Sequence, residues 1–170
     1  VLNEILQAGG RVVGIGKIED IYVKSGISHA VHTGSNKEGL ELTLKAVEGS
    51  LELDNIKIAD SKEPPVAELI FTNLVDTDML FGHRNDWKGY GNAIEEIDAF
   101  LPKIMDKMTK DDILFVTADH GCDPTVPGTD HTREQVPLLV YSKADNFIAK
   151  DLGILPTFAY VADEVRKWLL

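Results

Sequence analysis

Four short apolar runs, separated by stretches with helical periodicity, constrain the fold of this chain more than any other feature. They lie at residues 11–16, 69–75, 113–117 and 137–141, and each is apolar at nearly every position rather than at alternate ones. A strand that is apolar on both faces is buried on both sides, which is typical of a parallel sheet between helices. The sequence therefore predicts an α/β fold with a mostly parallel sheet covered by helices on both faces.

Two helices carry recognisable start signals. Ser35 is followed three positions later by Glu38, a capping-box pattern ahead of a helix near residues 36–48. Pro156 is expected to open a C-terminal helix, because proline is favoured at the first helical position. These helices are expected to cover the sheet.

Two other segments are less regular. Apolar residues recur on one helical face over residues 89–108, but Pro102 lies inside that range. An interior proline costs about 3 kcal/mol, so we expect a kink or two abutting helices there. Residues 49–66 are charged and proline-containing, and they are expected to form a loop or an insertion at the surface.

Composition excludes several classes of protein. The net charge of −11 leaves no basic stripe for nucleic acid or an anionic membrane surface. No segment approaches the roughly 18 apolar residues that cross a bilayer, so no membrane association is expected. The one cysteine, Cys122, rules out a disulfide within the chain and favours a reducing, cytoplasmic location. Cys122 is expected to serve as a small packed residue.

Carboxylates and imidazoles gather where two of the predicted strands end. Asp78 and His83 follow the second apolar run, Asp119 and His120 follow the third, and His131 comes after a short loop containing Gly and Pro. Ligands gather at the carboxyl ends of parallel strands, so we expect these side chains to lie together. Oxygen and imidazole ligands suit Mn²⁺, Zn²⁺ or Fe. Two such metals are a common device for phosphoryl transfer.

Neighbouring polar residues leave alternatives open. His29 and His32 form either a second ligand pair or, as we favour, ordinary loop or surface histidines. Asp130 and Glu134 flank His131 and are candidates to accept a hydrogen bond from a ligating ring. Helix capping or surface charge explains these two carboxylates equally well.

The sequence Asp-His-Gly at residues 119–121 is a short motif, and three longer blocks of sequence are more specific to one family. They span residues 14–21, residues 73–84, and residues 117–121 with 127–134. These blocks closely resemble the bacterial phosphopentomutase family of the alkaline phosphatase superfamily of two-metal enzymes. The resemblance runs over most of residues 1–145.

The resemblance implies two Mn²⁺ ions, with other divalent metals possible, flanking a phosphorylated threonine. It implies that Asp78, His83 and His131 hold one metal, and that Asp119 and His120 help to hold the other. The implied reaction interconverts ribose 1-phosphate and ribose 5-phosphate, or their deoxy analogues, with a sugar bisphosphate as activator.

Lys17 matches a lysine that lies near the substrate in the family. The resemblance therefore implies that Lys17 contacts the phosphate or the sugar. The alternative interpretation is a solvated lysine after a strand.

The resemblance also sets an expectation about extent. Residues 1–170 match the C-terminal portion of the metal-binding catalytic core, and the N-terminal core segment and cap domain are expected to be absent. The phosphoacceptor threonine is missing, so no catalytic residue is assigned, and neither Thr77 nor Thr125 is nominated. We expect the isolated chain to be inactive. The alternatives are a related metal phosphatase, a cofactor-independent phosphoglycerate mutase, or a metal-binding fragment without turnover.

Overall fold

The computed structural model describes residues 1–53, 56–57, 65 and 67–170, and these form two compact units. The first unit consists of Val1–Thr33, Lys45–Asn73 and Ile148–Leu170. The second consists of Gly34–Leu44 and Leu74–Phe147.

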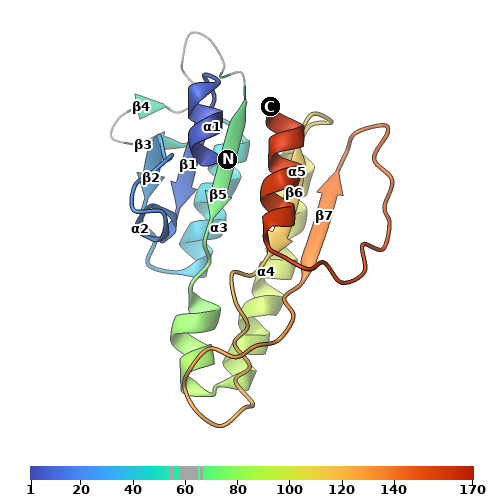
Figure 1. Ribbon diagram of the computed structural model, residues 1–170. Coiled ribbons are helices and arrows are strands. Elements are labelled where there is room, and N and C mark those ends of the chain that lie inside the picture. The colour runs from blue at the N-terminus through green and yellow to red at the C-terminus, as the bar shows by residue number, and fades with distance from the viewer. Residues whose placement is uncertain (54–55, 58–64, 66) are drawn as a thin grey trace. The chain divides into compact units, whose positions relative to one another are not determined.

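A parallel sheet forms the centre of the first unit (Figure 1). Strand β1 (Arg11–Ile15) lies between β2 (His29–Val31) and β5 (Glu68–Thr72), and it is parallel to both. Val12, Val13 and Ile15 on β1 are completely buried. Burial of consecutive residues means that both faces of β1 are covered, as its uninterrupted apolar run predicts. The predicted α/β class with a mostly parallel sheet is confirmed.

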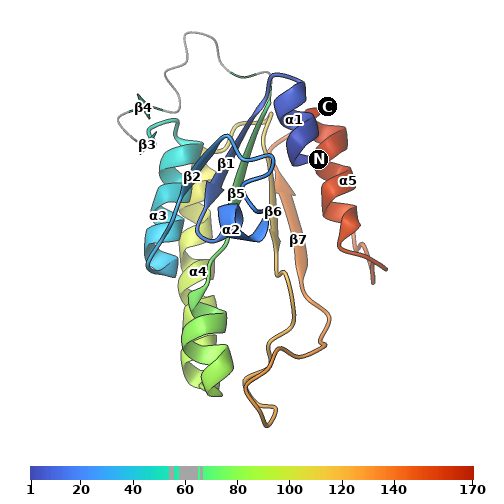
Figure 2. The same ribbon diagram turned by 60° about the vertical axis from the view of Figure 1, so that its left-hand side comes forward.

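Helices α1 (Leu2–Gln7) and α5 (Ala159–Leu169) lie side by side in the first unit (Figure 2). Arg166 of α5 donates from Nε to Glu4 Oε2 of α1 at 2.8 Å. Helix α5 begins at Ala159, so the prediction that Pro156 opens it is wrong. Val161 donates its backbone N–H to Phe158 O in the turn that starts the helix.

Part of the segment 49–66 has structure. Strands β3 (Glu52–Leu53) and β4 (Ile56–Lys57) form a two-residue antiparallel pair, where only a loop is expected from the sequence. Residues 54–55, 58–64 and 66 lie outside the described residues. The predicted insertion is therefore described only at residues 49–53, 56–57 and 65.

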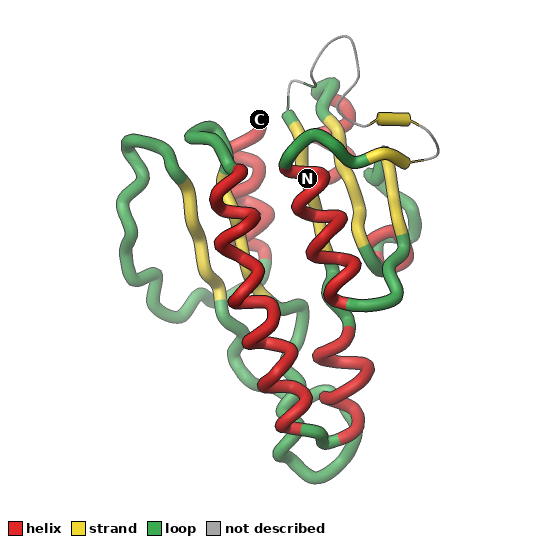
Figure 3. Tube along the Cα trace, turned by 180° about the vertical axis from the view of Figure 1, so that it is seen from behind, coloured by secondary structure: helices red, strands yellow, loops and turns green. Residues whose placement is uncertain are grey.

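The second unit contains an antiparallel pair, β6 (Ile113–Thr117) and β7 (Leu138–Ser142), with α4 (Trp87–Lys107) beside β6 (Figure 3). The antiparallel direction of β7 is a local departure from the predicted parallel order. Helix α4 is one continuous element with Pro102 inside it, so two abutting helices do not form. None of the helices in the described part of the chain is long and apolar enough to cross a membrane.

The predicted capping box at the start of α3 (Asn36–Val47) is confirmed. Ser35 Oγ accepts a hydrogen bond from the Glu38 backbone N–H at 3.2 Å, and Glu38 Oε2 accepts one from the Gly34 N–H at 2.7 Å. The first bond satisfies a backbone donor that the first turn of a helix leaves unpaired, and the second goes to the residue before Ser35 rather than to the Ser35 N–H.

His29, at the start of β2, makes the first unit sensitive to acid. Burial, with the nearby Arg11 guanidinium, lowers the pKa of His29 below its ordinary value of about 6.5. The unfolded chain then binds the proton more readily. The contribution of neutral His29 to the free energy of unfolding is therefore fully present above its ordinary pKa, and it is lost as the pH falls below that value. We expect His29→Gln to reduce the fall in Tm between about pH 7 and pH 5. Identical pH profiles for the two proteins would contradict this assignment.

Candidate metal centre

Two short helical turns after β5 carry Asp78 and His83. The first, η1 (Thr77–Phe81), is a wide π-helical turn, and the second, η2 (Gly82–Arg84), is a 3₁₀ turn. They lead into α4, whose first turn is capped by Asp86 Oδ1 accepting from the Gly89 N–H at 2.9 Å. Single π turns are frequent at functional sites because the wide turn displaces side chains from their usual helical positions.

The loop that follows β6 closes on itself and so brings His120 and His131 together. Gly121 and Thr132 form an isolated antiparallel bridge, and the Asp123 N–H donates to Thr132 Oγ1 at 2.7 Å. Thr125 donates its hydroxyl to Asp123 Oδ1 at 2.7 Å. This closed loop explains how residues eleven positions apart reach the same point.

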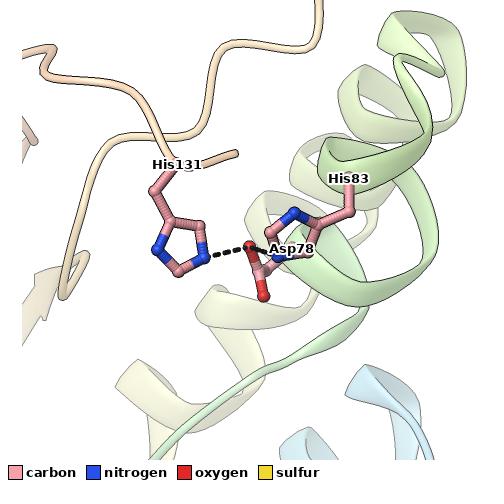
Figure 4. A group of neighbouring side chains, drawn as sticks. All are labelled: Asp78, His83 and His131. Atoms are coloured by element: carbon pink, nitrogen blue, oxygen red, sulfur yellow. Dashed lines mark ion pairs between the residues drawn. The ribbon is translucent and has the colours of Figure 1, made fainter. Parts of the chain in front are cut away.

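Three of the predicted ligands converge (Figure 4). Asp78 Oδ1 lies 3.2 Å from His83 Nε2 and 3.3 Å from His131 Nε2. One ligand atom from each residue falls within 4.8 Å of the others. Among the residues that the structure describes, this is the one group of three such side chains with that spacing.

The hydrogen bonding around this group favours a cation between the three side chains. His83 Nδ1 faces the Thr129 carbonyl oxygen, which only accepts, so Nδ1 carries the proton. In the tautomer with its proton on Nδ1, the ring presents Nε2 to Asp78 as an acceptor. Asp78 Oδ1 is buried and has no hydrogen-bond partner within the described ranges. Two acceptors at this distance repel unless a metal ion or an added proton lies between them.

His120 and Asp119 lie beside this group as a separate pair. The His120 ring stacks on His131 with centroids 3.6 Å apart and an interplanar angle of 19°. His120 Nδ1 is 3.2 Å from Gly121 O, and its Nε2 is 3.8 Å from Asp119 Oδ1. The structure thus brings His120 against His131, while the Asp119 side chain is 60% exposed and stands outside the group of three.

The remaining predicted residues are placed elsewhere or have other partners. Lys17 is an exposed residue that precedes α2 (Ile18–Ile21) in the first unit, whereas the five ligand candidates belong to the second. Its contact with substrate stays a prediction. His32 Nε2 lies 3.6 Å from Glu19 Oε2, and its Nδ1 lies 3.7 Å from Asp20 Oδ2. This is the surface arrangement that we favour for His32.

The structure adds a partner of His83 that sequence reasoning missed, and it shows what Cys122 packs against. The Thr129 carbonyl orients His83, and a backbone acceptor of this kind leaves no signal in the sequence. Cys122 packs against Gly82, where any Cβ would collide with its Sγ. Burial, with the charge and a hydrogen bond of Asp78, raises the pKa of the Cys122 thiol. Cys122 therefore stays protonated at neutral pH and acts as a packed residue, in keeping with its expected role.

A small cavity of about 130 Å³ lies next to His120. Tyr90, Cys122, Asp123, Glu134 and Gln135 contribute to its walls. Burial raises the pKa of the Tyr90 hydroxyl, and the nearby Cys122 and carboxylate charges add to the effect. The cavity therefore offers hydroxyl and amide groups beside two carboxylates.

Comparison with known proteins connects this geometry to one family. The model of the Metalloenzyme superfamily matches residues 12–167. The chain is 48% identical over 167 residues to a phosphopentomutase of Caldanaerobacter subterraneus subsp. tengcongensis, covering 98% of this chain and 38% of that protein. It is 45% identical over 168 residues to a phosphopentomutase of Anaeromyxobacter sp. (strain K), covering 99% of this chain and 39% of the relative. The chain thus spans less than two fifths of the length of these curated relatives.

Proposed function

Because the chain belongs to the metalloenzyme superfamily, we propose that it forms the metal-binding C-terminal portion of a phosphopentomutase catalytic core. Similarity over nearly its whole length to relatives named phosphopentomutase carries this proposal. The convergence of Asp78, His83 and His131 supports it independently of any name. Such an enzyme is an isomerase that moves a phosphoryl group within a pentose phosphate.

The proposed centre holds two divalent ions, for which we propose Mn²⁺. Asp78, His83 and His131 supply ligands to one ion, and Asp119 and His120 supply ligands to the other. The buried Asp78 Oδ1, which has no hydrogen-bond partner in the described part of the chain, and the Nδ1 contact of His83 with Thr129 support the first assignment. When bound, ions of this kind stabilise the attacking and leaving oxygens of phosphoryl transfer. His83 is already fixed in the required tautomer by Thr129, as metal-ligating histidines usually are.

The proposed substrates are ribose 1-phosphate, ribose 5-phosphate and their deoxy analogues, with a sugar bisphosphate as activator. Lys17 is proposed to contact the phosphate or the sugar, since an ammonium group suits either acceptor. The phosphoacceptor threonine is proposed to lie outside these 170 residues. A net charge of −11 and a single cysteine support a cytoplasmic protein that binds no nucleic acid or membrane.

The full-length product of the gene that encodes this chain tests the proposal. We expect it to convert ribose 1-phosphate to ribose 5-phosphate in saturating Mn²⁺, and we expect the 170-residue chain alone to bind metal without turnover. Conversion no faster than in buffer would rule out the mutase. Release of inorganic phosphate, or turnover of phosphoglycerate instead, would favour the related phosphatase or phosphoglycerate mutase.

A further inference from the structure

A reciprocal pair of hydrogen bonds joins the first turn of α3 to the start of η1. The Asn36 backbone N–H donates to Asp76 Oδ2 at 2.7 Å, and the Asp76 backbone N–H donates to Asn36 Oδ1 at 2.9 Å. The two residues are 40 positions apart in the sequence. This bridge is therefore a tertiary contact of the second unit rather than a local turn.

Asn36 is the more rigidly held of the two residues in this bridge. It is only 5% exposed, and the capping box formed by Ser35 and Glu38 fixes the helical turn that carries it. Its Nδ2 is buried without a hydrogen-bond partner in the described part of the chain, which costs about 1–3 kcal/mol.

Asp76 directly precedes η1 and lies two residues before Asp78. The far end of these turns is tied to the loop after β6, where Asn85 Nδ2 donates to Val126 O at 2.9 Å and His83 contacts Thr129 O. The bridge between Asn36 and Asp76 holds the other end, where η1 begins. Because Asp78 Oδ1 has no hydrogen-bond partner within the described ranges, the path of the backbone at η1 contributes to the position of that oxygen.

We propose that Asn36 is a positioning residue for the Asp78 carboxylate. By fixing Asp76, it holds the start of η1 so that Asp78 stays aimed at His83 and His131. This inference rests on the proposed metal centre. Asn36 does not instead mark an anion site at the start of α3, because the Asp76 carboxylate already accepts from that turn.

Mn²⁺ titration of the 170-residue chain by calorimetry tests this role. We expect Asn36→Ala to weaken Mn²⁺ binding by roughly 10- to 100-fold, the usual effect of losing a group that orients a ligand. The matched control is Ser142→Ala. Ser142 is 6% exposed, donates to Asp112 O at 2.7 Å and accepts from the Ala144 N–H at 3.1 Å. The control is expected to lower Tm but to leave Mn²⁺ affinity within about threefold, because it lies outside the proposed centre.

A second variant separates the bridge from the charge of Asp76 and avoids a large change in packing. Asp76→Asn retains an acceptor oxygen and the backbone N–H, so it is expected to keep Mn²⁺ affinity within about fivefold. A larger loss would show that Asp76 acts through its charge, and would overturn the role of the bridge. Unchanged affinity in Asn36→Ala, whatever its Tm, would overturn the inference about Asn36 alone. A wild-type chain that binds no Mn²⁺ would overturn the metal centre and this inference together.

Discussion

Replacing His131 with alanine is expected to remove about one bound divalent ion from each molecule. In the proposed centre, His131 Nε2 is one of three ligand atoms, together with His83 Nε2 and with Asp78 Oδ1, which lies 3.3 Å from it. Asp78 and His83 alone leave a two-ligand site, which rarely holds a divalent ion against chelation by buffer. Metal content after desalting, measured by inductively coupled plasma mass spectrometry, reports the change directly.

His32→Ala provides the matched control for this experiment. His32 is 62% exposed and lies beside Glu19 and Asp20 in the first unit, outside the proposed ligand set. This variant is expected to keep the wild-type metal content. Equal stoichiometry in His131→Ala and wild type would exclude His131 as a ligand. Equal losses in both histidine variants would point to a general effect of removing imidazole.

Replacing Gly16 with alanine is expected to lower the free energy of unfolding by about 3 kcal/mol, through left-handed strain and overpacking together. Gly16 ends β1 with φ of +82°, and a Cβ there would collide with the backbone carbonyl of Asn73. That carbonyl belongs to the segment that continues β5, whose Asn73 N–H donates to Ile15 O at 2.9 Å. Urea denaturation measures the loss.

Gly153→Ala separates the collision from the backbone strain. Gly153 has φ of +62°, lies in the same unit, and has nothing within 4 Å of its would-be Cβ. This control is expected to lose only about 1 kcal/mol, the cost of the left-handed conformation itself. Similar losses at both glycines would show that the close approach to Asn73 contributes nothing.

Some features follow from the local sequence because their causes are local. The apolar runs at β1, β5 and β6 specify strands, although only β1 is fully buried, while β5 and β6 are half-buried. The Ser35 and Glu38 capping box forms as predicted, since both partners lie within one helical turn. The start of α5 was missed because a proline fixes its own φ but does not oblige the chain to begin a helix there.

Other features depend on contacts that no local pattern encodes. The antiparallel direction of β7 is set by the path of the chain after β6, since periodicity is the same for both directions. The orientation of the His83 ring shows the same limit, and the prediction that Asp130 or Glu134 accepts a hydrogen bond from a ligating ring stays a prediction. The partner that the structure gives to the His83 ring is a backbone oxygen, and every residue carries one.

By itself, the sequence determined the α/β class and the candidate metal ligands, because the order of apolar residues and the chemical type of a side chain can be read from the sequence directly. The sequence predicted that Asp78, His83 and His131 lie near the carboxyl ends of the strands, but it did not fix the distances between their side chains. Only the tertiary structure decided that these three converge on Asp78 Oδ1, while Asp119 stands apart. The physical reason is that such convergence depends on the closed loop at Gly121 and Thr132 and on the bridge between Asn36 and Asp76, which join segments distant in the chain.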